Sequence, residues 1–166
     1  MNVKNINEFD NANILLVAGV GGHGEQLRRV RELLHCSMVT VITEPNLKWD
    51  YEDEIHFVER VVDYHNVNRL SSFVKFLKII ISTFKVLKKS KINLIISTGP
   101  AMAVPVCLVG KFMGAKVVHI ESWSRINSIS NSTKLILKLH LADVVVYQYK
   151  DNILAGRKKC QYWGHL

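Results

Sequence analysis

The sequence predicts an α/β fold: a single Rossmann-like domain built on one doubly wound, mostly parallel sheet. Short runs rich in β-branched residues alternate with helix-length segments, and several of these runs are continuously apolar, as strands covered on both faces require. A glycine-rich loop joins the first run to the first helical segment. The 166 residues fit one domain, and a hydrophobic content of 48% excludes a disordered or collagen-like chain.

The expected elements follow one another as β-α-β-β-α-β-α-β-α-β. Strands are expected at residues 14–18, 38–43, 55–61, 94–97, 116–120 and 144–147. Helices are expected at residues 24–36, 69–89, 101–113 and 132–141, and the pattern leaves open a further helix at 148–155. A polar tail is expected over residues 1–12 and the domain over residues 13–166. If the first and fourth strands flank the point where the strand order reverses, the loops after Ala18 and Ser97 face each other across one crevice.

The net charge of +8 is distributed unevenly along the chain. Residues 1–70 hold 7 Lys/Arg and 11 Asp/Glu, a balance of −4, whereas residues 71–166 hold 15 and 3, a balance of +12. A basic half is typical of a protein that binds either nucleic acid or an anionic membrane surface. No nucleic-acid motif or stacking aromatic pattern accompanies the lysines, so the sequence favours an anionic membrane and no nucleic acid.

Cysteine and histidine spacings give no sign of a metal or disulfide site. There are three cysteines, an odd number, and Cys36, Cys107 and Cys160 form no C-x-x-C motif. The seven histidines form no i, i+4 pair. We therefore expect no metal and no cofactor. The polar residues 1–12 do not resemble a signal peptide, and no apolar run reaches the roughly 20 residues of a spanning helix, so any membrane contact is expected to be peripheral.

The glycine-rich loop after the first strand is the strongest local signal. Gly21, Gly22 and Gly24 lead into an amphipathic helix, and backbone amides at a helix start bind phosphate or diphosphate groups. Gly19 completes a G-x-G-x-x-G with Gly21 and Gly24, and Glu44 lies 20 residues after Gly24, as in a dinucleotide fingerprint. A nicotinamide-binding protein is therefore a competing interpretation.

Two side chains in this loop are unexpected in a simple pyrophosphate cradle. His23 and Glu25 lie among the glycines, where such a cradle needs neither a base nor an acid. A histidine at this place can accept a proton from a hydroxyl nucleophile, so both residues are candidate catalytic groups. The alternative is that His23 bonds a neighbouring loop and Glu25 complements the helix dipole.

The strand at 94–97 ends in a second candidate loop. Ser97, Thr98, Gly99 and Pro100 form a strand-to-helix turn that can offer hydroxyl and N–H donors to a phosphate or a sugar. The same residues are also consistent with nothing more than a tight connection.

A third candidate loop follows the strand at 116–120. Glu121, Ser122 and Arg125 suit polyol and phosphate recognition at the carboxyl edge of a sheet, unless Glu121 and Arg125 form a local ion pair. His119 lies inside the strand pattern and is expected to be a core histidine.

The helix expected at 69–89 combines a lysine row with an apolar face. Lys75, Lys78, Lys85 and Lys89 gather on one side, and the apolar side is formed by Phe76, Leu77, Ile80, Phe84 and Leu87. The apolar face is expected to cover the sheet. The lysines are either a solvated face or a membrane-facing basic row. Attraction to anionic lipid would stabilise binding by roughly 1 kcal/mol per lysine near the surface.

The three loops, GVGGHGEQL, STGPAMAVP and HIESWSR, together resemble the PssD-like bacterial polysaccharide biosynthesis proteins. They are also similar to the eukaryotic membrane-anchoring subunit of the N-acetylglucosaminyltransferase that adds the second sugar to dolichol diphosphate. The resemblance spans about residues 13–166, including the closing YWGHL. More distantly, the loop order is similar to the N-terminal half of MurG, a GT-B glycosyltransferase with a lipid-diphosphate acceptor.

This resemblance implies the acceptor-side half of a split GT-B enzyme. A small partner would bind the UDP-sugar, and this chain would bind an undecaprenyl-diphosphate-linked sugar at the cytoplasmic face of the plasma membrane during capsular or exopolysaccharide synthesis. By carry-over, Gly21, Gly22 and Gly24 would hold the acceptor diphosphate, His23 would be the general base, and the Glu121 loop would face the interdomain cleft. Gly24 stands where the family often has Thr or Ser, and the membrane helix of the eukaryotic relative has no counterpart here.

Two other functions stay open on the sequence alone. One is a small NAD(P)-binding oxidoreductase or nucleotide-sensing module, based on the glycine fingerprint. The other is a non-catalytic scaffold that recruits a glycosyltransferase to the membrane, with His23 in a structural role.

Overall fold

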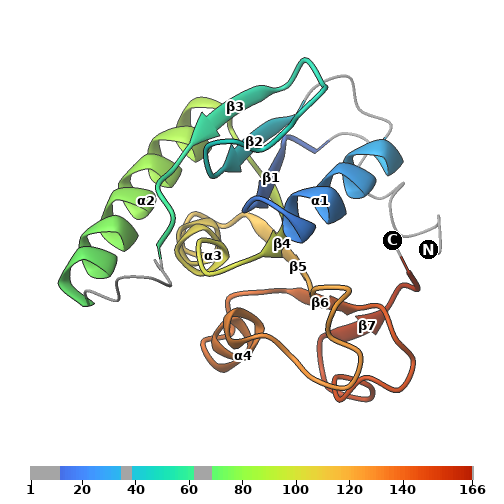
Figure 1. Cartoon of the computed structure of the whole chain (residues 1–166). Helices are drawn as coiled ribbons and strands as arrows, with labels where there is room; N and C mark the ends of the chain where they lie inside the picture. The colour runs from blue at the N-terminus through green and yellow to red at the C-terminus, as the bar shows by residue number, and fades with distance from the viewer. Residues whose placement is uncertain (1–11, 35–38, 62–68, 166) are drawn as a thin grey trace.

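The computed structural model describes residues 12–34, 39–61 and 69–165, and within them the strands form one parallel sheet. The strand order is β3-β2-β1-β4-β5-β6-β7 (Figure 1). The strands are β1 (Ile14–Ala18), β2 (Thr40–Thr43), β3 (Glu54–Phe57), β4 (Leu94–Gly99), β5 (Lys116–Ile120), β6 (Val144–Tyr147) and β7 (Cys160–Tyr162). The helices are α1 (Gly22–Leu33), α2 (Arg69–Lys89), α3 (Ala103–Phe112) and α4 (Asn131–Lys138).

Helices cover both faces of the sheet, which explains why β1 is apolar along its whole length. Leu15 and Val17 of β1 pack with residues of α2, α3 and α4, whereas Leu16 packs with Leu27 of α1 on the opposite face. Figure 1 shows α1 on one side of the sheet and α2, α3 and α4 on the other. The predicted α/β fold class is therefore confirmed, with a sheet that is parallel throughout the described residues.

The strand order reverses between β1 and β4, as the sequence predicts. β1 pairs with β2 on one side and with β4 on the other, so the chain winds outward in both directions from this pair. The backbone N–H of Gly19 donates to the carbonyl of Gly99 over 3.1 Å, and this bond joins the two loops directly. Both loops therefore lie at the carboxyl edge of the sheet, where β5 ends beside them.

Several predicted boundaries need correction. The strand at 55–61 is shorter and earlier, Glu54–Phe57, and the strand at 94–97 continues to Gly99. The helices begin or end one to three residues away from their predicted limits, at Gly22–Leu33, Ala103–Phe112 and Asn131–Lys138. Residues 1–11, 35–36 and 38, which belong to the predicted tail, first helix and second strand, lie outside the described residues.

The segment at 148–155 is not a helix, which corrects the option left open by the sequence. It forms turns in which the Asn152 side chain bonds backbone groups of another loop, a use of asparagine that competes with helix formation. The chain then enters β7, which the sequence pattern missed because this strand has only three residues and its side chains are largely exposed.

The helix α2 buries only part of the predicted apolar face: Phe76, Ile80 and Leu87 pack on the core as predicted. Ile79 and Val86 are also buried, but Leu77 and Phe84 are exposed, contrary to the expectation that they cover the sheet. The outer face carries an apolar row, which we call the α2 outer row: Leu70, Phe73, Val74, Leu77, Ile81 and Phe84.

Two of the four lysines in the predicted row are paired with carboxylates. Lys78 pairs with Glu59 at 3.2 Å and Lys89 pairs with Glu54 at 2.7 Å, both on the β3 side of the helix. Lys75 is half-buried and Lys85 is exposed.

Candidate functional site

The loops after β1, β4 and β5, together with the segments that follow β2 and β3, form two adjacent hollows at the carboxyl edge of the sheet. His23, Pro100 and Ala101 line both hollows and stand between them. The first, which we call the serine hollow, has a volume of about 300 Å³ and is otherwise lined by Ser122, Ser124, Arg125, Ser130, Asn131 and Ser132. The second, the Arg60 hollow, has about 160 Å³ and is otherwise lined by Val20, Glu44, Arg60, Val61 and Met102.

His23 is held in one orientation and one tautomer. Its Nδ1 lies 2.6 Å from the backbone carbonyl oxygen of Thr98. Because a carbonyl oxygen only accepts, Nδ1 must carry the proton, and Nε2 is left as an acceptor. The Thr98 hydroxyl donates in return to the carbonyl of His23 over 2.9 Å. The predicted histidine thus lies in the cleft with a proton-accepting nitrogen.

Gly99 is required where the imidazole meets the β4 loop. Its φ is +92°, which is unfavourable for other residues, and a Cβ at this position would lie 3.2 Å from both Nδ1 and Cε1 of His23. A side chain at 99 would therefore strain the backbone and push the imidazole out of place.

The start of α1 offers backbone amides, as the glycine-rich loop predicts. Gly21 has a φ of +71°, and its carbonyl accepts from the N–H of Glu25. Within the described residues, no protein acceptor is recorded for the amides of Gly22, His23 and Gly24. These amides are the groups that an anion at a helix N-terminus would use.

Glu25 lies outside both hollows. Its carboxylate pairs with Arg28 at 2.9 Å and with Arg29 at 3.6 Å on the surface of α1. The structure therefore brings His23 into the cleft but does not bring Glu25 with it.

Most of the predicted β4 residues bond other protein groups and do not line the hollows. Ser97 is buried and its hydroxyl accepts from the N–H of Gly99 over 3.2 Å, and the Thr98 hydroxyl is used by His23. Pro100 alone of this group lines the hollows. The turn is therefore both a tight connection and one wall of the cleft.

The Glu121 side chain binds the backbone of its own loop. Its side chain is buried, and its two oxygens accept from the backbone N–H groups of Ser122 and Ser130, each over 2.8 Å. The alternative ion pair with Arg125 is not found in the described part of the chain. Ser122 and Arg125, by contrast, do line the serine hollow.

Arg60 was missed by sequence reasoning. Its guanidinium donates to Glu44 from Nε over 3.0 Å and from a terminal nitrogen over 2.9 Å, and this pair forms one wall of the second hollow. Nothing in the local sequence indicates the pair, because the partners lie on separate segments. The serines and Asn131 of the other hollow were indicated only by the Ser/Asn-rich composition of residues 122–132.

Two positions of the dinucleotide fingerprint, Gly19 and Glu44, contact other parts of the protein. A Cβ on Gly19 would lie 2.7 Å from Cδ of Pro100, so this proline ring already covers the first glycine. Glu44, the acidic residue of the fingerprint, is paired with Arg60. The carboxylate that a dinucleotide site would use for a ribose hydroxyl is thus already bound by an arginine, which counts against the nicotinamide interpretation.

His119 is a core histidine, as expected. It is buried, and its Nε2 lies 2.8 Å from the Thr133 hydroxyl. Burial, with a smaller contribution from the nearby His23, lowers the pKa of His119 to about 3. Burial therefore favours the neutral form of this ring.

The described residues contain neither a candidate metal cluster nor a helix that could span a membrane. They contain no group of three or more His, Cys, Asp or Glu side chains placed to hold a metal ion. None of their helices combines the length and the apolar composition needed to cross a bilayer.

Comparison with known protein families gives one match. The model of the family described as oligosaccharide biosynthesis protein Alg14 like covers residues 14–166. No curated protein matches the sequence significantly.

Solved structures share the fold. MurG from Acinetobacter baumannii superposes with a TM-score of 0.59 at 19% identity, over 81% of this chain and 40% of that one. UDP-GlcNAc 2-epimerases from Methanocaldococcus jannaschii and Neisseria meningitidis give TM-scores of 0.54 and 0.55 at 16% and 17% identity. Each comparison covers 83% of this chain and 40% of the epimerase. The chain thus spans about two fifths of these structures, and the likeness concerns the Rossmann-like fold of a GT-B domain.

Proposed function

The chain belongs to the Alg14-like family of oligosaccharide biosynthesis proteins, and from this premise we propose that it is the acceptor-binding subunit of a two-protein glycosyltransferase. A small partner binds the UDP-sugar, and this chain binds a sugar linked to a lipid diphosphate, with undecaprenyl diphosphate as the carrier. The pair extends a capsular or exopolysaccharide repeat unit at the cytoplasmic face of the plasma membrane. The observation that carries this proposal is His23, with Nδ1 held by Thr98 and Nε2 left as an acceptor between two hollows.

In the proposed reaction, His23 acts as general base. Its Nε2 takes the proton of an acceptor-sugar hydroxyl as that oxygen attacks the anomeric carbon of the donor sugar. The bond between that carbon and the UDP oxygen breaks, and UDP leaves with the electron pair in the partner's site. The bond from Nδ1–H to the Thr98 carbonyl stabilises the imidazolium that forms. Glu25, outside the hollows, is not needed for this step.

The acceptor diphosphate is assigned to the start of α1 and the serine hollow. The amides of Gly22, His23 and Gly24 offer donors, and Arg125 supplies the one cationic side chain of the hollow lining. Among the residues that the structure describes, no carboxylate lines this hollow. An anionic group is therefore matched by donors without repulsion from the lining.

The membrane contact is assigned to the α2 outer row, in place of the lysine row. Large exposed apolar side chains recur at helical spacing along the whole helix, from Leu70 to Phe84. Because α2 returns from the carboxyl end of β3, its first turns lie at the same edge of the sheet as the cleft. A bilayer along this row would lie beside a site that receives a lipid-linked substrate.

Reconstitution tests the two-protein arrangement. The chain is co-expressed with a candidate donor-binding protein encoded beside it, and transfer from a radiolabelled UDP-sugar to a lipid-diphosphate-linked acceptor is followed. We expect transfer only when both proteins are present. Transfer by the chain alone, or binding of UDP-sugar by this chain, would contradict the proposal.

A further inference from the structure

The connection between β6 and β7 holds the loop that forms one wall of the serine hollow. Its side chains donate hydrogen bonds to backbone carbonyls between Glu121 and Ser128, a loop more than 20 residues earlier in the chain. The donors are Gln148 to the Glu121 carbonyl at 2.9 Å, Tyr149 to the Trp123 carbonyl at 2.7 Å, and Asn152 to the carbonyls of Arg125, Ile126 and Ser128 at 2.9, 2.8 and 3.3 Å.

Asn152 makes the largest share of these bonds and is itself fixed. It is only 2% exposed, and its Oδ1 accepts from the N–H of Leu154 over 3.0 Å. Because the three loop carbonyls can only accept, the amide nitrogen of Asn152 must face them. The side chain therefore has a single orientation, with its acceptor toward its own segment and its donors toward the loop.

Glu121 binds the same loop as a hydrogen-bond acceptor, whereas Asn152 binds it as a donor. Its carboxylate accepts from the amides of Ser122 and Ser130, at the two ends of the loop, while Asn152 donates to carbonyls in the middle. The loop backbone is thus bonded to buried side chains at both ends and in its middle. Its side chains Ser122, Ser124 and Arg125 are left to line the hollow beside His23.

This bonding pattern affects the electrostatics of the hollow. The carbonyl of Arg125 is already engaged by Asn152, so the residue meets a ligand through its guanidinium and not through its backbone oxygen. Within the described parts of the chain, the lining contains the Arg125 cation, serine hydroxyls and an asparagine, and no carboxylate. Such a lining favours a phosphate or diphosphate group.

We propose that Asn152 is the positioning residue that fixes Arg125 for a diphosphate in the serine hollow. The inference rests on the proposed function, because the diphosphate is that of the proposed acceptor. Asn152 does not touch the ligand; it acts by bonding the backbone of residues 125, 126 and 128.

A double-mutant cycle on the full-length chain tests this role, with inorganic pyrophosphate as the probe. Affinity is measured by isothermal titration calorimetry for the wild type, Arg125→Ala, Asn152→Ala and the double variant. We expect each single variant to weaken binding by about tenfold and the double variant to be no weaker than either, because both remove the same contact. Asp151→Ala, a change in an exposed neighbour, is the matched control and is expected to bind like the wild type.

Asn152→Asp keeps the experiment informative if the alanine variant does not fold. It preserves the volume and Oδ1, but places a second carboxylate oxygen against three carbonyls. We expect it to weaken pyrophosphate binding by about tenfold or more. We also expect faster amide hydrogen exchange within residues 122–130 than in the wild type, with exchange in β1 and β4 unchanged.

The outcomes separate this inference from the proposed function. Wild-type affinity in both Asn152 variants, or a double variant in which the two losses multiply, would overturn the positioning role and leave the phosphate assignment intact. Absence of pyrophosphate binding by the wild type would overturn both the phosphate assignment and this inference. The base role of His23 is tested independently by the transfer reaction.

Discussion

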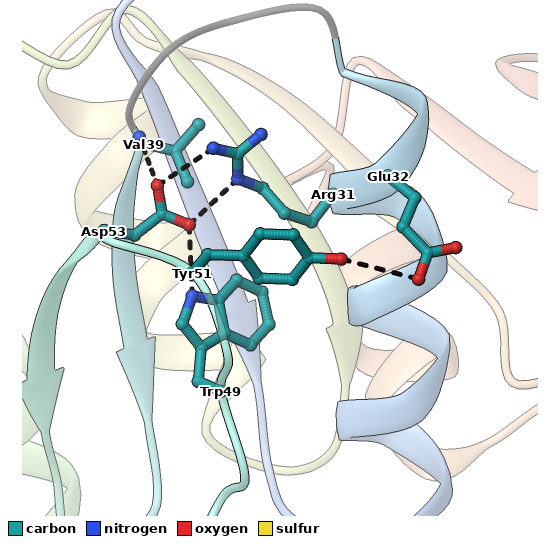
Figure 2. Close-up of polar contacts among 6 residues, drawn as sticks. All are labelled: Arg31, Glu32, Val39, Trp49, Tyr51 and Asp53. Atoms are coloured by element: carbon teal, nitrogen blue, oxygen red, sulfur yellow. Dashed lines mark hydrogen bonds and ion pairs between the residues drawn. The ribbon is translucent and has the colours of Figure 1, made fainter.

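The Arg31 guanidinium binds the Asp53 carboxylate through two hydrogen bonds, of 2.9 Å from Nε and 3.1 Å from a terminal nitrogen (Figure 2). Asp53 also accepts from the backbone N–H of Val39 and the indole N–H of Trp49, each over 3.0 Å. One buried carboxylate therefore joins the last turn of α1 to the entrances of β2 and β3. It fixes the segment that connects these two parallel strands without a helix.

Replacing Asp53 by Asn is expected to destabilise the fold without altering the site. The change removes the carboxylate that binds Arg31, whose side chain is only 9% exposed, at a cost of about 3 kcal/mol. Urea denaturation measures this loss. Asp50→Asn is the control, because Asp50 is 77% exposed and lies 3.9 Å from Arg28, and it is expected to change stability little. Equal stability of the two variants would contradict this account.

The same carboxylate is expected to make stability depend on pH in the acid range. Burial alone would raise the pKa of Asp53, but hydrogen bonds from Arg31, Val39 and Trp49 outweigh it and hold that pKa below its usual value. A lowered folded pKa means that the stabilisation is complete above the unfolded pKa of about 4 and is lost as the pH falls toward the folded value.

Urea denaturation at a series of pH values measures this dependence. The free energy of unfolding of the wild type should fall below about pH 4, and that of Asp53→Asn should fall less steeply. Equal slopes for the two proteins would mean that Asp53 is not the group responsible.

Gly99→Ala is expected to lose both stability and transfer activity. The positive φ costs about 1–2 kcal/mol, and the new Cβ displaces the His23 ring. Gly114→Ala is the matched control: it has a φ of +81° with no atom near the new Cβ, so it should lose similar stability and keep transfer. Thermal denaturation and the transfer assay read the two effects separately. Activity losses that track stability in both variants would contradict the contact with His23.

Membrane binding is expected to depend on the α2 outer row. Ile81→Glu places a charge in the middle of this row and should strongly reduce co-sedimentation with vesicles of phosphatidylglycerol and phosphatidylethanolamine. Lys78→Ala should change binding much less, because Lys78 is already paired with Glu59. If Lys78→Ala reduced vesicle binding more than Ile81→Glu, the lysine row and not the α2 outer row would be the membrane contact.

Continuous apolar patterns made the core of the fold predictable. β1, β5 and β6 have the predicted limits, because each is a short β-branched run that is buried on both faces. The loop order placed His23 beside the β4 turn. In contrast, β7 has no apolar pattern, and α2 is apolar on more than its buried face, so a helical wheel could not tell which side covers the sheet.

The contacts that support the site could not be predicted from the sequence, for a different reason. Glu121 and Asn152 bond backbone amides and carbonyls, which every residue has, so no residue type in the loop signals these partners. The Arg60–Glu44 pair depends on the spatial approach of two segments. The sequence therefore indicated some of the residues that line the hollows, such as His23 and Arg125, but not the contacts that hold them.

The most direct test of the central claim is the single-turnover rate of sugar transfer by the reconstituted pair carrying His23→Ala. Loss of a general base predicts a decrease of about 10²- to 10⁴-fold, with unchanged folding and partner binding. His140→Asn, a change in an exposed histidine at the end of α4, is the control and should transfer at the wild-type rate. A wild-type rate in His23→Ala would show that His23 is not the base and that this chain acts as a non-catalytic scaffold.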